Sequence, residues 1–449
     1  MQGIMNDNSS LTKQFIKFLL PSVSAMWFFS IYTMVDGIFV GKGVGPTALA
    51  AVNISMPYIN AIFSLALLIS VGASTLIAFH LGEGNQHLGN QLFTLNTVVL
   101  TIIGVIITVL SLFFLEPISI FLGATPETLT YVKDYLGIII IFSTCFMVAY
   151  SLEVLVKTDG FPIYAIIFVT LAAFINIVLD YVFVIVYDYG VKGAAFATGL
   201  SQLISGIGFL VHFLIGRSNL KFTRFKFDFK QIGKMIYIGF PEALTELSAG
   251  FTTFAFNYVI LRVLGYQGIA AFGVIMYINN LVLMTMIGIN QGMQPLISFY
   301  NGQKNQANIK KLLKLSLQTA LGFGLLFLIV SQIFSEQLVG LFITPDNPAP
   351  FNIALKGISL FSFGFLICGF NIIISGYFTA LKFAGKAMTI SFLRGYGLIS
   401  LTLAILPQFL GDTGIWLAPA IYEILTLLVA LPLYLNHREK QKMLISKVA

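Results

Sequence analysis

The chain has 449 residues, of which 57% are hydrophobic and only 10% are Asp, Glu, Lys or Arg. Soluble domains carry roughly 25% charged residues, so this composition excludes a water-soluble protein and makes lipid the solvent. The formal net charge of +7 does not indicate nucleic-acid binding, because the basic residues lie in short loops between apolar segments.

The apolar segments are long and continuous, as in the run 98–115. A spanning helix needs ~20 mostly apolar residues, whereas barrel strands read as alternating segments of ~10 residues. The pattern therefore predicts an all-α integral membrane protein. In chain order, twelve transmembrane helices are expected near residues 14–40, 47–80, 90–116, 129–156, 161–187, 193–216, 235–262, 269–300, 311–339, 354–381, 387–410 and 413–436.

Basic residues are distributed unequally between alternate loops. With the N-terminus inside the cell, 19 Lys and Arg residues fall in cytoplasmic segments and five in outer segments. Lys157, directly after the fourth expected span, is counted among the cytoplasmic ones. Because positive charge is retained on the cytoplasmic side, both termini are expected in the cytoplasm of a multi-pass protein of the cell (inner or plasma) membrane.

The chain contains an internal duplication. With a shift of 220 residues, the segment 48–86 overlays 268–306 without a gap, and the pattern Gly-x-x-Asn-Gln occurs at 82–86 and at 302–306. Six spans per half is an even number, so both halves enter the membrane in the same orientation. Two six-helix lobes related by a pseudo-two-fold axis along the membrane normal are expected, as in transporters that rock one half against the other.

This organisation divides the chain into three parts. Residues 1–216 are predicted to form the N-terminal lobe, which carries spans 1–6, and residues 235–449 the C-terminal lobe, which carries spans 7–12. Residues 217–234 form a basic cytoplasmic linker between the lobes. Cys145 and Cys368 fall inside spans, where apolar packing is expected rather than a disulfide or a metal site.

Two carboxylates, Asp36 and Asp180, fall inside the first and fifth spans, and an ionisable residue at membrane depth is a functional candidate by default. Asn176 lies four residues before Asp180 and shares its helical face. Counted from the outer turns, Thr198 and Tyr135 are expected at a similar depth. These oxygen ligands suit Na⁺; alternatively, two nearby carboxylates in a low dielectric hold one proton between them. A purely structural hydrogen-bond network remains the alternative to either function.

Several motifs resemble the MATE (multidrug and toxic compound extrusion) family over essentially the whole chain. They are Pro21, 34–41 (MVDGIFVG), 48–53 (ALAAVN), 176–180 (NIVLD), 190–198 (GVKGAAFAT), 239–241 (GFP) and 414–416 (GIW). The detail is most similar to the DinF-type branch with its MepA-like drug exporters. The resemblance implies a cation site at Asp36, Asn176, Asp180, Thr198 and Tyr135.

The second half departs from the first at these positions. Phe256 and Pro419 replace the counterparts of Asp36 and Thr198. Glu242 and Glu246 lie early in the seventh span, near its cytoplasmic end, and are candidates for contact with a cationic substrate, although a solvated pair at the cavity mouth is the simpler interpretation. Met276 and Met284 are candidates for an adaptable cavity wall. Arg394 and Glu423 lie inside spans 11 and 12, where an ion pair is expected.

The sequence therefore predicts a secondary active exporter that couples Na⁺ or H⁺ entry to export of small, mostly cationic or amphipathic drugs or toxic compounds. The chain is expected to act as a monomer in the lipid bilayer, without a bound cofactor and without enzymatic activity. The alternative is a flippase for a lipid-linked or amphiphilic substrate. A flippase would favour cationic residues in its cavity, whereas the first half offers acidic ones.

Overall fold

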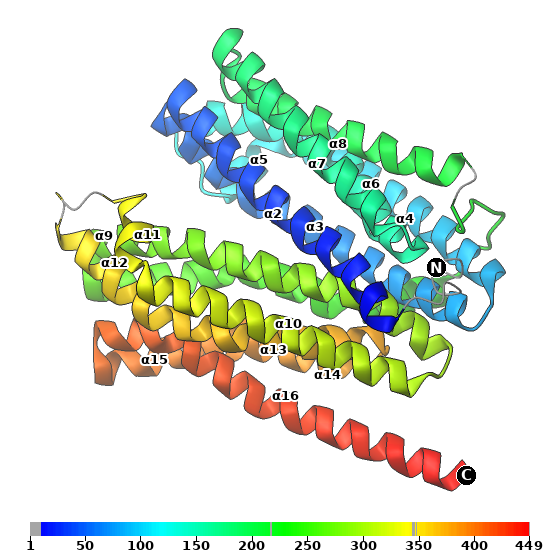
Figure 1. Cartoon of the computed structure of the whole chain (residues 1–449). Coiled ribbons are helices and arrows are strands. Elements are labelled where there is room, and N and C mark those ends of the chain that lie inside the picture. The colour runs from blue at the N-terminus through cyan, green and yellow to red at the C-terminus, as the bar shows by residue number, and fades with distance from the viewer. Residues whose placement is uncertain (1–9, 216–217, 344–345, 347, 449) are drawn as a thin grey trace.

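A computed structural model describes residues 10–215, 218–343, 346 and 348–448, with side chains described as far as residue 440. Within these residues the chain is helical and contains no strand. The helices form two lobes, which lie close together at one end of the molecule and farther apart at the other (Figure 1). The all-α, two-lobed architecture predicted from the sequence is confirmed.

The first lobe contains six spans. They are α2 (Leu11–Gly43), α3 (Pro46–Gly82), α4 (Gln86–Phe113), α6 (Leu129–Asp159), α7 (Pro162–Asp180) with its π-helical continuation η1 (Tyr181–Val186), and α8 (Gly190–Leu214). The short helix α5 (Leu115–Phe121) follows the third span. Local chemistry sets the boundaries: Asn85, for example, accepts a hydrogen bond from the amide of Leu88 (3.1 Å) and so begins α4.

The second lobe begins with α9 (Phe229–Gly302) and continues with α10 (Gln306–Ile333) and the short α11 (Ser335–Gly340). One span combines α12 (Pro348–Phe361), the 3₁₀ turn η2 (Ser362–Gly364) and α13 (Phe365–Ala380). The next combines α14 (Ala384–Phe392), the π-helical segment η3 (Leu393–Gly397) and α15 (Leu398–Leu410). The last is α16 (Asp412–Val448).

Helix α9 is a hairpin of two spans. Gly265 has φ 65° and ψ −160°, values outside the helical region. Phe256 and Phe272 lie on either side of it, and their rings stack with centroids 5.0 Å apart, although a straight helix would separate residues 16 apart by roughly 24 Å. Eleven segments of the described chain have the length and hydropathy of a membrane span, and the α9 hairpin supplies the twelfth.

At the end of the molecule where the lobes lie close together, here called the closed end, glycines of one lobe contact the backbone of the other. A Cβ atom on Gly82 would overlap the backbone oxygen of Phe299, and a Cβ atom on Gly302 would overlap the backbone oxygen of Phe79. These contacts are reciprocal, since Phe299 and Gly302 are the counterparts of Phe79 and Gly82 under the 220-residue shift. Gly72 against Met235 and Gly239 against Leu68 extend this seam. Small residues at such contacts let helix backbones approach closely in a membrane.

Side-chain contacts also join the two lobes at the closed end. The Tyr300 hydroxyl donates to Gln14 Oε1 across the lobes (2.8 Å). In the turn between α13 and α14, Lys382 Nζ lies 3.1 Å from the ring centroid of Phe79 in the first lobe. Partial burial lowers the pKa of Lys382 from its ordinary value, and the nearby Glu83 carboxylate opposes that shift.

The segment that joins the lobes is attached to the first lobe. The Asp159 carboxylate accepts hydrogen bonds from the backbone amides of Asn219 and Leu220, both 2.9 Å, and from Ser218 Oγ (2.9 Å). His212 Nε2 lies 2.9 Å from the same carboxylate. The irregular segment is shorter than the predicted linker 217–234, because Asp228 accepts from Lys230 N (2.8 Å) and α9 begins at Phe229.

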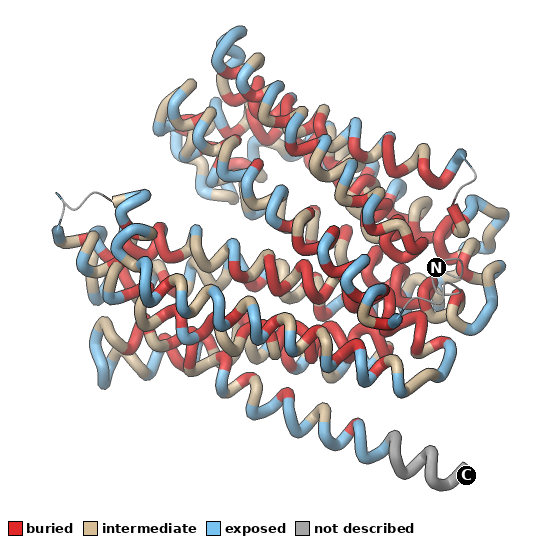
Figure 2. The backbone as a smooth tube through the Cα atoms, viewed as in Figure 1, coloured by how far each residue is buried: buried red, intermediate tan, exposed pale blue. Residues whose placement is uncertain are grey.

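The outer surface is strongly apolar. Phe113, Phe121 and Phe174 are exposed by 80%, 89% and 65%, and Figure 2 shows exposed segments along the outer faces of both lobes. Surfaces of this kind are costly in water and are satisfied by lipid. The burial pattern therefore fits the membrane location inferred from composition.

Prediction for the lobe contact. Gly302→Ala should lower the apparent melting temperature in detergent, because the added methyl group overlaps Phe79 and overpacking costs about 1–3 kcal/mol. The matched control is Gly322→Ala in α10, where no heavy atom lies within 4 Å of the added Cβ. Equal melting temperatures for the two variants would show that the glycine seam is not a tight contact.

Candidate functional site

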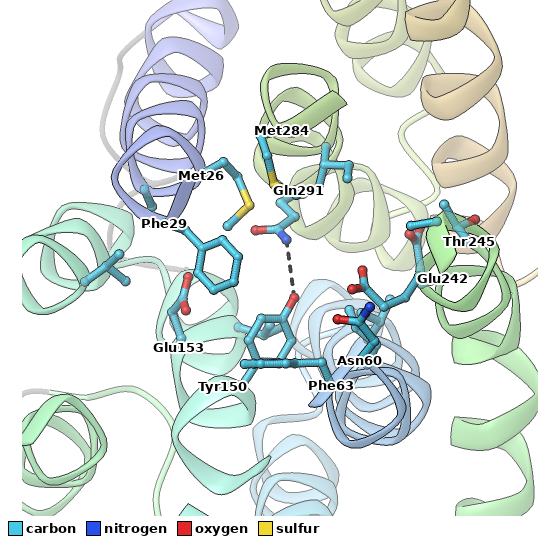
Figure 3. A pocket seen from close by; sticks show the side chains of 18 of the residues that line it. Met26, Phe29, Asn60, Phe63, Tyr150, Glu153, Glu242, Thr245, Met284 and Gln291 are labelled. Carbon is cyan, nitrogen blue, oxygen red and sulfur yellow. Dashed lines mark hydrogen bonds between the residues drawn. The ribbon is translucent and has the colours of Figure 1, made fainter. Parts of the chain in front are cut away.

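A cavity of about 460 Å³ lies between the two lobes. Its walls come from α2, α3, α6, α7 and α8 of the first lobe and from α9, α13, α14 and η3 of the second. The wall combines apolar residues such as Met26, Phe29, Phe63 and Met284 with polar ones (Figure 3). The ionisable Asp, Glu, Lys and Arg residues of the wall are Asp36, Glu153, Lys157, Glu242, Glu246 and Arg394.

The five residues predicted to form a cation site lie together at one side of this cavity. Asp36, Tyr135 and Thr198 line it. Asn176 lies behind them, and its Nδ2 donates to Thr198 Oγ1 over 3.4 Å. Asp180 is fully buried and close enough to Asp36 to feel its charge. The cluster therefore has a layer that faces the cavity and an inner layer made by Asn176 and Asp180.

Four oxygen atoms of this cluster lack hydrogen-bond donors. Within the described part of the chain, nothing donates to Asp36 Oδ1, Asn176 Oδ1 or either carboxylate oxygen of Asp180. Unpaired buried oxygens of this kind are costly, and either a proton or a bound hard cation would satisfy them. The donor set therefore fits Na⁺ or H⁺, and the residues that would hold the ion are Asp36, Asn176 and Asp180, with Thr198 beside them.

The backbone near the cluster is irregular. Asp180 is the last residue of α7, and the chain continues directly into the π-helical segment η1. Such π-bulges inside α-helices occur frequently at functional sites. The second lobe has a comparable segment, η3, which carries Arg394.

Sequence reasoning missed Tyr32 and Gln202. Both line the cavity together with Asp36. Tyr32 lies four residues before Asp36 on α2, so helical spacing places both on one face. That spacing is the signal that could have identified Tyr32.

Lys157 was assigned wrongly to a cytoplasmic loop. It lies inside α6, which continues to Asp159, and its side chain is only 3% exposed. Its ammonium lies 2.7 Å from Glu153 Oε1 and 3.0 Å from Gln291 Oε1. Glu153 and Gln291 were missed altogether, although the i,i+4 spacing of Glu153 and Lys157 is typical of a helical ion pair.

Glu242 and Glu246 lie in the wall of the cavity, and both are partly exposed. Glu242 Oε1 accepts from Gln294 Nε2 (2.5 Å) and from Asn290 Nδ2 (3.3 Å), both on the second arm of the α9 hairpin. Neither glutamate forms a salt bridge with a described residue. The second lobe thus presents an uncompensated acidic wall.

One of the two methionine predictions is wrong. Met284 lines the cavity, whereas Met276 does not. The Met276 sulfur lies 3.9 Å from Asn279 Nδ2, and its side chain packs against the apolar core of the second lobe. Helical phase explains the difference, because residues eight apart lie about 80° apart around an α-helix.

The expected Arg394–Glu423 ion pair is present, with Arg394 Nε 2.8 Å from Glu423 Oε1. Asn371 Nδ2 donates to the other oxygen of Glu423 (2.6 Å). At the counterpart of Asp36, Phe256 is fully buried and packs between Phe272 and Phe361. The position that carries a carboxylate in the first lobe therefore carries an aromatic core in the second.

Comparisons with known proteins agree with this architecture. The sequence profile of the MatE family matches residues 21–182 and 241–406. The chain belongs to the MatE family. The chain is similar to the multidrug export protein MepA of Staphylococcus saprophyticus, with 24% identity over 95% of this chain and 94% of that protein. It has the same identity and coverage with MepA of Staphylococcus aureus strain NCTC 8325.

Solved structures show the same fold. One is described as the outward-facing conformation of a multidrug resistance MATE family transporter; it is 21% identical, covers 99% of both chains and gives a TM-score of 0.92. Another, described as MATE in the bent conformation, gives 0.90 at 21% identity and covers 100% of this chain and 99% of that one. The predicted family is confirmed, and with it a multi-span membrane transporter fold.

Prediction for the ion pair. Arg394→Met should destabilise the protein by about 3–5 kcal/mol, because it leaves the Glu423 carboxylate buried without its partner. The double variant Arg394→Met/Glu423→Gln should recover much of that loss. Thermal unfolding in detergent measures both. A double variant no more stable than the single one would contradict a paired, structural role.

Proposed function

We propose that this MatE-family chain exports small organic cations by antiport with Na⁺ or H⁺. The observation that supports this most directly is the charge of the cavity. Asp36, Glu242 and Glu246 face it without a salt-bridge partner among the described residues, whereas Lys157 and Arg394 are each paired with a glutamate. Aromatic and Met side chains of the same wall suit apolar rings of varied shape. The names of the MepA relatives, multidrug export proteins, favour the same assignment.

The closed end is proposed to face the cytoplasm. Its turns carry Lys304 and Lys382, and the irregular segment 218–228, which contains Lys221, Arg224 and Lys226, lies at the same end (Figure 1). At the opposite end, Lys133, Lys192 and Lys356 are paired with Glu116, Asp134 and Asp412. Lys and Arg are more frequent at the closed end than at the opposite end, and basic residues are retained on the cytoplasmic side, so the cavity would face outward in this conformation.

Coupling is proposed to arise at the wall that carries Asp36. This side chain belongs both to the cation cluster and to the cavity surface, so a coupling ion and a bound organic cation act on the same carboxylate. Each ligand then weakens binding of the other, and this effect is reciprocal by linkage. Ion entry from outside would release the substrate outward, and the lobes would then rock against each other, which separates the glycine seam, to reset. The match to the MatE family gives no support to the flippase alternative.

Prediction for coupling. Asp36→Asn and Asp180→Asn should each abolish export of ethidium from proteoliposomes under imposed Na⁺ or H⁺ gradients, because the cluster loses an anionic ligand. The control is Asp134→Asn, which removes an outer-end carboxylate paired with Lys192 at 3.2 Å and should retain export. Full export by both cluster variants would refute the assignment, and the gradient that drives wild-type export identifies the ion.

Prediction for substrate binding. Glu242→Gln and Glu246→Gln should each weaken ethidium binding to the purified protein by roughly tenfold, the effect of losing about 1.4 kcal/mol, because the cation loses a carboxylate. Asp180→Asn should not weaken this affinity, since Asp180 does not line the cavity and loss of the coupling ion removes a competitor. Fluorescence titration separates the two classes of variant. An unchanged affinity in both Glu variants would remove them from the substrate site.

A further inference from the structure

One polar group of the cavity has no part in the proposed transport. Lys157 Nζ lies 2.7 Å from Glu153 Oε1 on the same helix and 3.0 Å from Gln291 Oε1 on the opposite lobe. Gln291 Nε2 in turn donates to the Tyr150 hydroxyl over 3.4 Å. Glu153, Lys157, Tyr150 and Gln291 all line the cavity, and Figure 3 shows the bond between Tyr150 and Gln291.

These contacts keep the Lys157 ammonium next to the Glu153 carboxylate. The carboxamide of Gln291 uses its NH₂ group on Tyr150 and its oxygen on Lys157, so its orientation is fixed from both ends. The order Glu before Lys at i,i+4 is the favourable one on a helix. With 3% and 11% of the two side chains exposed, water screens the pair little. Glu153 is therefore a carboxylate in the cavity wall whose charge is cancelled.

The cancelled charge makes the two walls different. Glu242 and Glu246 leave the wall of α9 acidic, and Glu153 and Lys157 leave the wall of α6 neutral. In Figure 3, Glu153 and Glu242 lie on opposite sides of the pocket. A substrate with one positive end finds a partner on α9, but a second positive end directed at α6 finds none.

We propose that Lys157 is a specificity-determining residue, which masks Glu153 and so disfavours organic cations whose second charged end would lie against α6. This inference rests on the proposed function, because it assumes that organic cations occupy the cavity. A different reading, in which Lys157 binds an anionic group of the substrate, would require its charge to be free. The short contact to Glu153 opposes that reading.

The test compares decamethonium, which carries a quaternary ammonium at each end, with decyltrimethylammonium, which carries one. Binding of each to the purified full-length protein is measured by calorimetry at neutral and at alkaline pH. The variants are Lys157→Met, Glu153→Gln and the double variant Glu153→Gln/Lys157→Met, which has the same net charge as the wild type. Melting temperature and gel filtration establish that each variant is folded.

Wild type should bind decyltrimethylammonium at least as tightly as decamethonium. Lys157→Met exposes the carboxylate and should tighten decamethonium binding about tenfold while changing the monocation little. Glu153→Gln exposes the ammonium and should weaken both, the dication more. The double variant should return to the wild-type ratio, since removing both charges leaves the wall of α6 neutral again.

The outcomes separate the two proposals. If wild type binds neither cation, the proposed function fails and this inference falls with it. If wild type binds the monocation but the ratio is the same in all four proteins, the masking role of Lys157 is refuted and the proposed function stands. If Lys157→Met does not fold, Glu153→Gln still tests the masking role, because this variant should weaken decamethonium binding where Lys157→Met should tighten it. Tighter binding of a decanoate anion to Glu153→Gln together with unchanged cation binding would favour the anion-binding reading instead.

Discussion

The arrangement of this molecule depends on the close approach of helix backbones at one end. In lipid, no hydrophobic force draws apolar helices together, so association rests on packing and on small residues that allow it. Here Gly82 and Gly302 each lie against the backbone of the other lobe, and the duplication makes the two contacts equivalent. Because this seam occupies one end only, the lobes diverge toward the other. Polar side chains can then stand in a cavity between them.

The cavity also determines which ionisable side chains can lie at membrane depth without an ionic partner. Two buried glutamates have a cationic partner: Glu153 pairs with Lys157, and Glu423 pairs with Arg394. No cationic partner is present in the described chain for the carboxylates of Asp36, Asp180 and Glu242. Buried charge is costly unless it is paired, so a proton, an ion or a cationic ligand at these three positions would stabilise the protein. The two lobes are alike in fold and unlike in this respect, since Phe256 fills the place of Asp36 with an aromatic core.

The fold was largely predictable because the bilayer leaves few choices. Helices must satisfy their own backbone hydrogen bonds, so length and hydropathy located all twelve spans, and the repeat at 82–86 and 302–306 revealed the lobes. The neighbourhood of Asp36 and Asp180 followed from counting residues inward from turns. Lys157 was misplaced because a charge at the end of an apolar run resembles a loop residue, while the helix continues to Asp159. The prediction that Met276 lines the cavity did not hold, because hydropathy alone does not indicate which face of a buried helix borders a cavity.

The closed end also shows how the copied halves diverged. Gly84 and Gly160 adopt positive φ values in turns of the first lobe, whereas lysines occupy the corresponding turns of the second, with φ 58° at Lys304 and 68° at Lys382. A lysine in this conformation costs of order 1 kcal/mol. At Lys382 the ammonium lies on Phe79 of the other lobe, and a cation–π contact contributes ~0.5–2 kcal/mol, enough to offset that cost. This contact joins the two lobes at the closed end, so it stabilises the arrangement of the lobes described here. The glycine at the equivalent turn of the first lobe has no side chain with which to do the same.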